Sequence, residues 1–449
     1  MGSTLPPVAF IGLGAMGFGM ATNLIRLGYP VTGFDVYKPT LDRFKEAGGQ
    51  VATSPAEAVA GKQSCVCMVA TAEQAQGVLF DGDNAAVPAL PQGAALLLCS
   101  TVPCGYVQSL EQMLISKGRG DIALIDCPVS GGAGRAADGT LSIMAGGADA
   151  SIQKSLSLLQ AMSDPAKLYV VKGGIGAGSN MKMCHQVLAA NQILSASEAL
   201  GFASHLGLDL AKTSQAILKS EGWSWMFENR LPRLLHPEFQ PVASAVTIIL
   251  KDTSIITSEA RRARFPASMT TAAEQVYFSS LSRGFGTDDD SSLLRLYIQG
   301  KNSIGPVKPL VETDEAKINL VVNLLRGIHV CAAAEAIAFA HHVGLDLDQV
   351  LELCLNAAGG SSMLSSFGRI FVDASRDGRA SSGWTAHDNE TTLQTLAQEL
   401  RSSINEGQRL KLPLFLGTQA YNLVEGVLHA AKEDTHRLAI GSIISSWAA

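Results

Sequence analysis

Residues 8–24 read VAFIGLGAMGFGMATNL, and this stretch decides the fold of the N-terminal part of the chain. The apolar run Val8–Gly12 is typical of a buried strand, and the helical pattern Gly17–Leu27 follows it after a GxGxxG turn. The first glycine permits a tight turn, the second lets the backbone approach a pyrophosphate, and the third lets the helix pack close to the strand. The stretch therefore predicts a dinucleotide-binding turn, formed by Gly12, Leu13, Gly14, Ala15, Met16 and Gly17.

The second apolar run, Val31–Asp35, ends in an acidic residue 18 positions beyond Gly17. A carboxylate at this place can accept hydrogen bonds from both ribose hydroxyls of NAD and repels the extra phosphate of NADP. No arginine follows at the next two positions, and Lys38 is the nearest cation. The residues therefore favour NAD over NADP, with Asp35 as a cofactor ligand.

Further apolar runs bounded by glycine or proline continue this pattern to about residue 172. They are Cys65–Ala70, Ala95–Cys99, Ala123–Asp126 and Leu141–Ala145, and helix-length stretches such as Thr40–Ala47 lie between several runs. Strands that alternate with helices predict a parallel sheet with right-handed crossovers. We therefore expect residues 1–172 to form an α/β Rossmann domain.

From Asn180 to about Tyr297 the pattern is helical, and it becomes helical again in the last part of the chain. Val187–Asp209 and Leu324–Asp346 align at a shift of 137 with ten of 23 positions identical, and residues 258–266 resemble 405–413 at a shift of 147. Chance similarity of alanine-rich helices is the alternative to an internal duplication. The two blocks in the same order favour duplication, with all-α domains at 173–305 and 306–449. Asp288–Asp290 and Gly300–Lys308 predict an exposed boundary.

Composition excludes several other classes of protein. Hydrophobic residues make up 47% of the 449 residues and charged residues 16%, and the net charge of −6 argues against nucleic acid as a partner. No apolar run reaches the roughly 18 residues of a membrane helix, and residues 1–7 do not resemble a signal peptide. None of the eight cysteines belongs to a CxxC or Cys/His cluster. We expect a cytoplasmic protein with buried reduced thiols, no membrane contact and no metal site.

Four motifs in order resemble those of the β-hydroxyacid dehydrogenases, the superfamily of 3-hydroxyisobutyrate, tartronate-semialdehyde and 6-phosphogluconate dehydrogenases. They are Gly12–Gly17, DCPVSGG (126–132), GTLSIMAGG (139–147) and GAGSNMKMCHQVLAA (176–190). The resemblance covers residues 7–300, and the remainder looks like a second copy of the family's helical domain. It implies a Rossmann domain followed by two tandem all-α domains, and NAD-dependent oxidation of a small hydroxyacid.

The resemblance also implies roles for residues of the fourth motif. Lys182 matches the family's catalytic lysine, the general acid/base that handles the hydroxyl proton; an ordinary solvated lysine is the alternative. The family usually carries asparagine four residues later, where this chain has Gln186 preceded by His185. This variant is similar to the threonate and erythronate dehydrogenase branch. It leaves open whether Gln186 orients the substrate hydroxyl and whether His185 contacts substrate.

The remaining matches concern substrate and cofactor. Ser130, Gly131 and Gly132 match the family's substrate loop, which suits a carboxylate. Val69, Ala70 and Thr101 end apolar strands beside the expected nicotinamide site. Lys251-Asp252 matches a pair whose lysine reaches cofactor and substrate in the family, and a surface ion pair is the alternative.

The second helical copy departs from this pattern. Asn319 stands opposite Lys182, and Gln398-Glu399 stands opposite Lys251-Asp252. We expect this copy to be non-catalytic and to replace a partner subunit's helical domain, which gives a monomer with an internal pseudo-dimer or a homodimer. Two other interpretations stay open: an imine reductase on the same scaffold, whose relatives often lack the lysine, and a non-catalytic dinucleotide-binding sensor.

Overall fold

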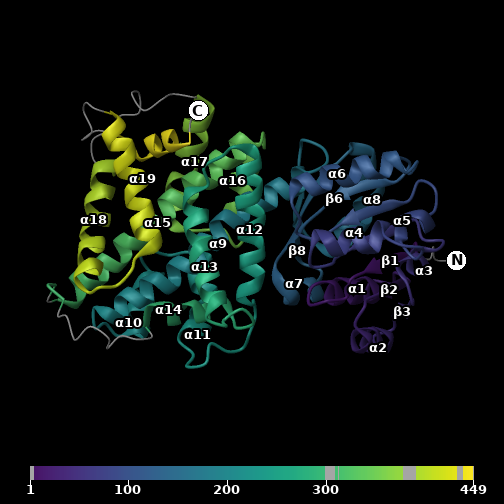
Figure 1. Cartoon of the computed structure of the whole chain (residues 1–449), viewed down its shortest axis with the longest axis horizontal. Helices are drawn as coiled ribbons and strands as arrows, with labels where there is room; N and C mark the ends of the chain where they lie inside the picture. The colour runs from purple at the N-terminus through teal and green to yellow at the C-terminus, as the bar shows by residue number, and fades with distance from the viewer. Residues whose placement is uncertain (1–4, 299–308, 312, 378–390, 432–437, 448–449) are drawn as a thin grey trace. The chain divides into compact units, whose positions relative to one another are not determined.

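The computed structural model describes residues 5–298, 309–311, 313–377, 391–431 and 438–447 (Figure 1). Its contacts divide the chain into two units. Unit 1 comprises Met1–Lys182 with Gly344–Gln349, and unit 2 comprises Met183–Val343 with Val350–Ala449.

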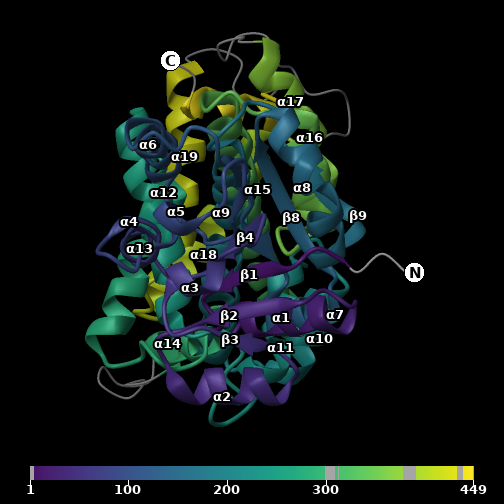
Figure 2. The ribbon, with the colours of Figure 1, turned by 90° about the vertical axis from the view of Figure 1, so that its right-hand side faces the viewer.

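Unit 1 contains a nine-stranded sheet in the order β3-β2-β1-β4-β5-β6-β8-β7, with β9 paired to β8. Its strands are β1 (Val8–Ile11), β2 (Val31–Phe34), β3 (Gln50–Val51), β4 (Ser64–Cys67), β5 (Ala95–Leu98), β6 (Ala123–Asp126), β7 (Val129–Ser130), β8 (Leu141–Gly147) and β9 (Ser163–Val170). Its helices are α1 (Gly17–Arg26), α2 (Lys38–Glu46), α3 (Pro55–Val59), α4 (Ala72–Phe80), α5 (Ala86–Ala89), α6 (Cys104–Ser116), α7 (Gly132–Asp138) and α8 (Asp149–Met162). Figure 2 shows β3, β2, β1 and β4 side by side.

The strands β1, β4, β5 and β6 alternate their side chains between two buried faces. Phe10 and Val66 belong to the core on one face, while Ile11 and Cys65 belong to the core on the other. Strands that are covered on both faces read as continuous apolar runs, which is why the sequence located them. All eight cysteines are buried and none forms a disulfide, so the prediction of buried thiols is confirmed.

The prediction of an all-parallel sheet is wrong at its far edge. The strands from β3 to β6 in the sheet order are parallel, but β8 pairs with β6 and with β7 in the antiparallel direction. Only residues 131–140 separate β7 from β8, and this connection is shorter than the dozen or more residues that a crossover to a parallel strand needs. The chain therefore returns from β7 into β8 in the antiparallel direction. Apolar patterning locates a strand but carries no information on its direction.

The C-terminal region is helical in the described residues, apart from isolated bridges. It contains α9 (Ala177–His205), which begins in unit 1, then α10 (Leu210–Leu218), α11 (Trp225–Leu234), α12 (Val246–Ala263), α13 (Ser268–Ser282), η1 (Asp290–Leu294) and α14 (Arg295–Ile298). It continues with α15 (Asp314–His342), α16 (Leu347–Asn356), α17 (Ser362–Asp377), α18 (Leu393–Arg409), α19 (Phe415–Ala431) and η3 (Ile440–Ser446). By length and composition α15 could cross a membrane, but 83% of its apolar window is buried, so it is a core helix.

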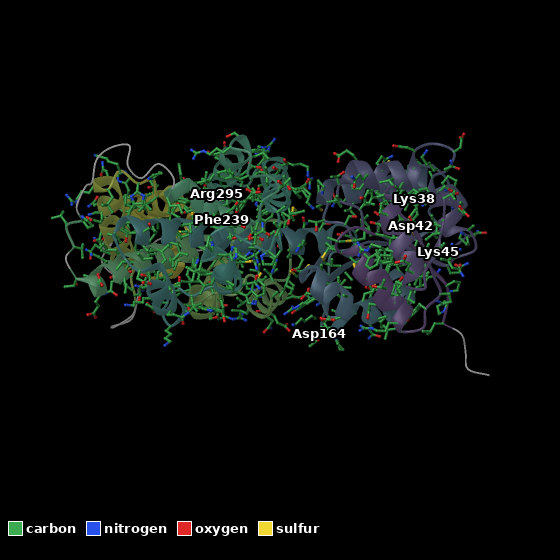
Figure 3. All side chains as sticks on the ribbon, turned by 90° about the horizontal axis from the view of Figure 1, so that it is seen from below. Lys38, Asp42, Lys45, Asp164, Phe239 and Arg295 are labelled. Carbon is green, nitrogen blue, oxygen red and sulfur yellow. The ribbon has the colours of Figure 1, made fainter. Side chains whose placement is uncertain are left out.

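The acidic triplet that was expected to mark an exposed boundary is folded into unit 2. Asp289 and Asp290 are buried and pair with Arg233 at 3.0 Å and with Arg230 at 2.8 Å. Arg295 also packs over the ring of Phe239 in this region (Figure 3). These carboxylates are buried because distant arginines neutralise them, which local sequence cannot show. The other expected boundary segment, Gly300–Lys308, lies outside the described residues.

Two buried glutamates in unit 2 each hold the start of a distant helix. Glu335 of α15 accepts hydrogen bonds from the N–H groups of Met269 and Thr270 at the start of α13, at 2.7 and 2.9 Å. Glu198 of α9 accepts bonds from the N–H groups of Leu416 and Gly417 in α19, at 3.1 and 2.9 Å. Burial raises the pKa of each carboxyl from 4.5 to about 7.

These raised pKa values predict that stability falls with rising pH. Between pH 4.5 and about 7 the folded state holds protons that the unfolded state has released, so the free energy of unfolding decreases as pH rises. The decrease is at most about 1.4 kcal/mol per pH unit for each carboxyl. Urea unfolding at pH 5, 6 and 7 measures this slope. Glu198→Gln and Glu335→Gln do not titrate and should each flatten it; slopes equal to that of the unaltered protein would contradict the assignment.

Candidate active site

The glycine-rich turn between β1 and α1 has the geometry that its sequence predicts. Gly12 has φ +93°, and a side chain on it would collide with the carbonyl of Met68. A side chain at Gly17 would collide with the carbonyl of Gly12, so the helix and the strand approach closely here. A Cβ atom at Gly14 would meet no protein atom within 4 Å. Packing therefore explains Gly12 and Gly17, while Gly14 faces open space, which fits the approach of a pyrophosphate.

Asp35 ties the end of β2 to this turn. Its Oδ2 accepts the Leu13 N–H at 2.7 Å and its Oδ1 accepts the Tyr37 N–H at 2.8 Å. Each oxygen keeps a further lone pair for a ligand hydroxyl. Lys38, the nearest cation, pairs with Asp42 at 3.0 Å on the surface of α2 (Figure 3). The Asp35 carboxylate thus lies at the glycine-rich turn, whereas Lys38 is paired with Asp42 and not with Asp35.

The ends of β4 and β5 meet at the same edge of the sheet. The fully buried Ser100, directly after β5, accepts the Val69 N–H at 2.9 Å, and Ala70 donates to Gln74 at 2.9 Å. Thr101 follows Ser100. Because carboxyl ends of parallel strands share one edge, Val69, Ala70 and Thr101 lie on the edge that carries the glycine turn and Asp35. Unit 1 therefore contains the residues predicted to bind the cofactor except Lys251, which belongs to unit 2.

The SGG loop lies at the antiparallel edge of unit 1. Ser130 belongs to β7 and pairs with Ser142 of β8, and Gly131 and Gly132 have φ values of +141° and +75° at the start of α7. Only glycine adopts such values readily, so the loop backbone carries no side chain that would shield its N–H groups.

Lys182 lies in the second turn of α9, and 5% of its surface is exposed. This burial does not fit the alternative of an ordinary solvated lysine. The first turn of α9 is held by Asp126 at the end of β6, whose carboxylate accepts the N–H and the hydroxyl of Ser179, both at 2.7 Å. Burial raises the pKa of Asp126 to about 6, against the lowering effect of these bonds. Sequence reasoning missed Asp126 and Ser179, although the acid directly precedes the CPVSGG motif.

Four predicted substrate residues form a connected chain in unit 2. Gln186 Nε2 donates to Asp252 Oδ2 at 2.5 Å, and Gln186 Oε1 lies 2.9 Å from His185 Nδ1. Asp252 Oδ1 lies 3.2 Å from Lys251 Nζ. Since a carboxylate only accepts, the Gln186 amide must turn its NH₂ to Asp252 and its oxygen to His185. His185 then donates from Nδ1, which assigns its tautomer.

These hydrogen bonds make Gln186 a link between α9 and α12. Lys251 and Asp252 do form an ion pair, as the alternative interpretation of that motif held, but Asp252 is buried and also serves Gln186. The positions that the sequence aligns with Lys251-Asp252 differ: Glu399 pairs with Arg326 at 2.7 Å, and Arg326 also contacts Glu221 at 2.9 Å. Asn319, opposite Lys182, is exposed.

Two family models match the chain. One, described as the NAD binding domain of 6-phosphogluconate dehydrogenase, matches residues 7–174. The other, described as NAD-binding of NADP-dependent 3-hydroxyisobutyrate dehydrogenase, matches residues 176–297 and 316–442.

Individual relatives agree with these models. L-threonate dehydrogenase of Cupriavidus necator is 36% identical over 290 residues, which are 65% of this chain and 95% of that protein. Mitochondrial 3-hydroxyisobutyrate dehydrogenase of Mus musculus is 30% identical over 295 residues, 64% of this chain and 86% of that protein.

Solved structures extend the comparison. 3-Hydroxyisobutyrate dehydrogenase from Salmonella typhimurium aligns with TM-score 0.59 and 30% identity over 65% of this chain and 100% of its own. Plasmodium falciparum 6-phosphogluconate dehydrogenase aligns with TM-score 0.67 over 94% of this chain and 92% of its own, and at 15% identity it shows the fold alone. The chain therefore belongs to the 3-hydroxyisobutyrate and 6-phosphogluconate dehydrogenase-like family of NAD(P)-dependent hydroxyacid dehydrogenases.

Proposed function

We propose that this protein oxidises a small hydroxyacid of the threonate or 3-hydroxyisobutyrate type, with NAD as the preferred hydride acceptor and Lys182 as the general base. The observation that carries this proposal is the buried Lys182 on a helix seated against the sheet that bears the dinucleotide turn. The L-threonate and 3-hydroxyisobutyrate dehydrogenases among the relatives supply the substrate class.

The reaction divides into two transfers. A bound nicotinamide would supply the acceptor for the hydride that leaves the hydroxyl-bearing carbon. Lys182 Nζ accepts the hydroxyl proton in the oxidation and returns it in the reverse reduction, so the alcohol loses two electrons and two hydrogens in total. Lys182 must be unprotonated to begin the oxidation.

The other residues bind and orient. Ser130, Gly131 and Gly132 hold the substrate carboxylate through a hydroxyl and backbone N–H groups. His185, Gln186, Lys251 and Asp252 form the substrate side of unit 2, in which the connected hydrogen bonds keep each group in one orientation. Gly12–Gly17, Asp35, Val69, Ala70, Thr101 and Lys251 serve the cofactor.

The role of Lys182 can be tested by replacement with alanine. NADH formation is followed with threonate, erythronate, glycerate, 3-hydroxyisobutyrate and 3-hydroxypropionate. Lys182→Ala should lower kcat by about 10²–10⁴-fold, the usual contribution of a general acid–base group, while NAD binding persists. Lys167→Ala, which removes a partly exposed lysine paired with Asp164, is the control and should keep full activity. Turnover that survives in Lys182→Ala would favour the imine reductase, and NAD binding without turnover in the unaltered protein would favour the sensor.

The preference for NAD can be tested at Asp35. Asp35→Ala should lower the ratio of kcat/KM with NAD to kcat/KM with NADP by about 10–100-fold, because a charge-assisted hydrogen bond to ribose contributes about 1.5–3 kcal/mol and the repulsion of a phosphate is lost as well. Asp164→Asn removes another carboxylate of unit 1 and should leave the ratio unchanged. An unchanged ratio in Asp35→Ala would show that Asp35 only shapes the turn.

We also propose that the helical region consists of two copies, at 173–305 and 306–449, that form an internal pseudo-dimer after the Rossmann domain at 1–172. The helices run in matching order, and α9 and α15 each have 29 residues. The contacts are reciprocal: Trp225 N–H donates to the Gly360 carbonyl at 2.9 Å and Ser362 N–H to the Trp223 carbonyl at 3.1 Å. In the same way, Glu198 of the first copy holds the start of α19 in the second, and Glu335 of the second copy holds the start of α13 in the first. Such reciprocity is the property of a two-fold interface between subunits.

The pseudo-dimer predicts an active monomer. Sedimentation at assay concentration should show a 47.0 kDa species, and specific activity should not change on dilution, because the second copy already covers the surface that a partner would cover. An activity that falls on dilution together with dissociation of a larger species would contradict the proposal and favour the homodimer.

A further inference from the structure

The first turn of α9 is buried, so its free N–H groups need acceptors from outside the helix. Asp126 supplies them. Its side chain is fully buried, its Oδ2 accepts the Ser179 N–H and its Oδ1 accepts the Ser179 hydroxyl, both at 2.7 Å. The Gly176 N–H is a further donor to the same carboxylate. Three donors from one helix start thus converge on one side chain at the end of β6.

Glycines bring the helix start into contact with the sheet. A side chain on Gly178 would collide with the carbonyls of Met144 and Asp126, and one on Gly146 would lie 2.7 Å from the Gly178 nitrogen. A side chain on Gly176 would lie 2.6 Å from the Cys104 sulfur of α6. The backbone of α9 therefore rests directly on β6 and β8, with no side chain between them to absorb a shift.

Lys182 lies about one helical turn after Ser179 on α9. Residues three apart lie on one face of a helix, and helical side chains lean toward the N-terminus, so the stem of Lys182 covers the turn that contains Ser179. Both residues are buried, with 5% and 2% of their surface exposed. A displacement of the first turn therefore moves the backbone from which the Lys182 side chain extends.

We propose that Asp126 is a positioning residue for the reaction, which holds Lys182 in register with the sheet edge through Ser179. The proposal rests on the function proposed above, in which Lys182 moves the proton. A misplacement of about 1 Å can cost roughly 10²-fold in rate, so a fixed helix start has a direct effect on turnover. Burying a carboxylate costs free energy, and this cost is accepted where one side chain must satisfy several donors.

The test compares variants that remove the hydrogen bonds between Asp126 and the start of α9 with one that keeps most of them. Ser179→Ala removes one bond, Asp126→Ala removes all of them, and Asp126→Asn keeps two, because its oxygen accepts the Ser179 N–H and its NH₂ donates to the Ser179 hydroxyl. Asp121→Ala is the matched control, since Asp121 precedes the opposite end of β6 and accepts the Gly93 N–H at 2.7 Å.

We expect kcat to fall about 10-fold in Ser179→Ala and about 10²-fold in Asp126→Ala, with KM for NAD within about 2-fold, since no residue proposed to bind the cofactor is changed. Asp126→Asn should stay within about 3-fold of the unaltered protein, and Asp121→Ala should keep kcat whatever its melting temperature. Hydrogen exchange should quicken at residues 179–184 in the two alanine variants at positions 126 and 179 only. If Asp126→Ala does not fold, Ser179→Ala and Asp126→Asn carry the test.

Three outcomes would overturn the proposal. Normal kcat in Ser179→Ala and Asp126→Ala, with Lys182→Ala inactive, would refute the positioning role and leave the proposed function intact. A fall in kcat in Asp126→Asn as large as that in Asp126→Ala would show that the negative charge of Asp126 matters and not its hydrogen bonds to Ser179. Unchanged exchange at residues 179–184 would show that Asp126 does not hold the helix. Absence of turnover in the unaltered protein would instead refute the proposed function and this inference with it.

Discussion

A buried helix start must find acceptors for its N–H groups, and this constraint organises the whole molecule. In the described part of the chain, carboxylates from distant elements meet it at three helix starts: Asp126 for α9, Glu335 for α13 and Glu198 for α19. Each carboxylate is buried, and burial raises the pKa of each. These bonds attach α9 to the sheet in unit 1, and they join α15 to α13 and α9 to α19 in unit 2.

Because α9 is a single helix of 29 residues, residues proposed for several different roles lie on one element. Its first turn contacts the sheet, Lys182 follows in unit 1, and His185 and Gln186 follow in unit 2. Glu198, three turns further on, holds α19. One helix thus carries the lysine proposed for proton transfer, the groups proposed to orient the substrate and the glutamate that holds α19.

The departure from the family's usual asparagine acquires a physical meaning in this setting. The longer glutamine spans His185 and Asp252 at the same time, with 2.9 and 2.5 Å bonds, and so links α9 to α12. Asp252 in turn orients Lys251. At the positions that the sequence aligns with Lys251 and Asp252, the ion pairs of Arg326 with Glu399 and Glu221 take the place of this polar chain.

Local patterns sufficed for much of the candidate site. The GxGxxG turn, Asp35 at the end of β2 and the strand ends at Val69 and Thr101 were all readable, because a tight turn, an acidic strand end and a buried strand each depend on adjacent residues. The match between Val187–Asp209 and Leu324–Asp346 pointed to duplication for the same reason. The family's motifs placed Lys182 on a helix, where the structure has it.

The sequence by itself thus located the buried strands β1, β2, β4, β5, β6 and β8, the glycine-rich turn and the family, but not β3, β7 and β9. Only the tertiary structure decided the antiparallel direction of β8, the burial of Asp289 and Asp290, and the carboxylates that hold α9, α13 and α19. The reason is the range of the interactions. A turn or an amphipathic run is settled by neighbours a few residues away, whereas Asp126 and Ser179 are 53 positions apart and Glu198 and Gly417 are 219 apart. Whether such a charge is exposed or buried depends on which partner the fold brings to it.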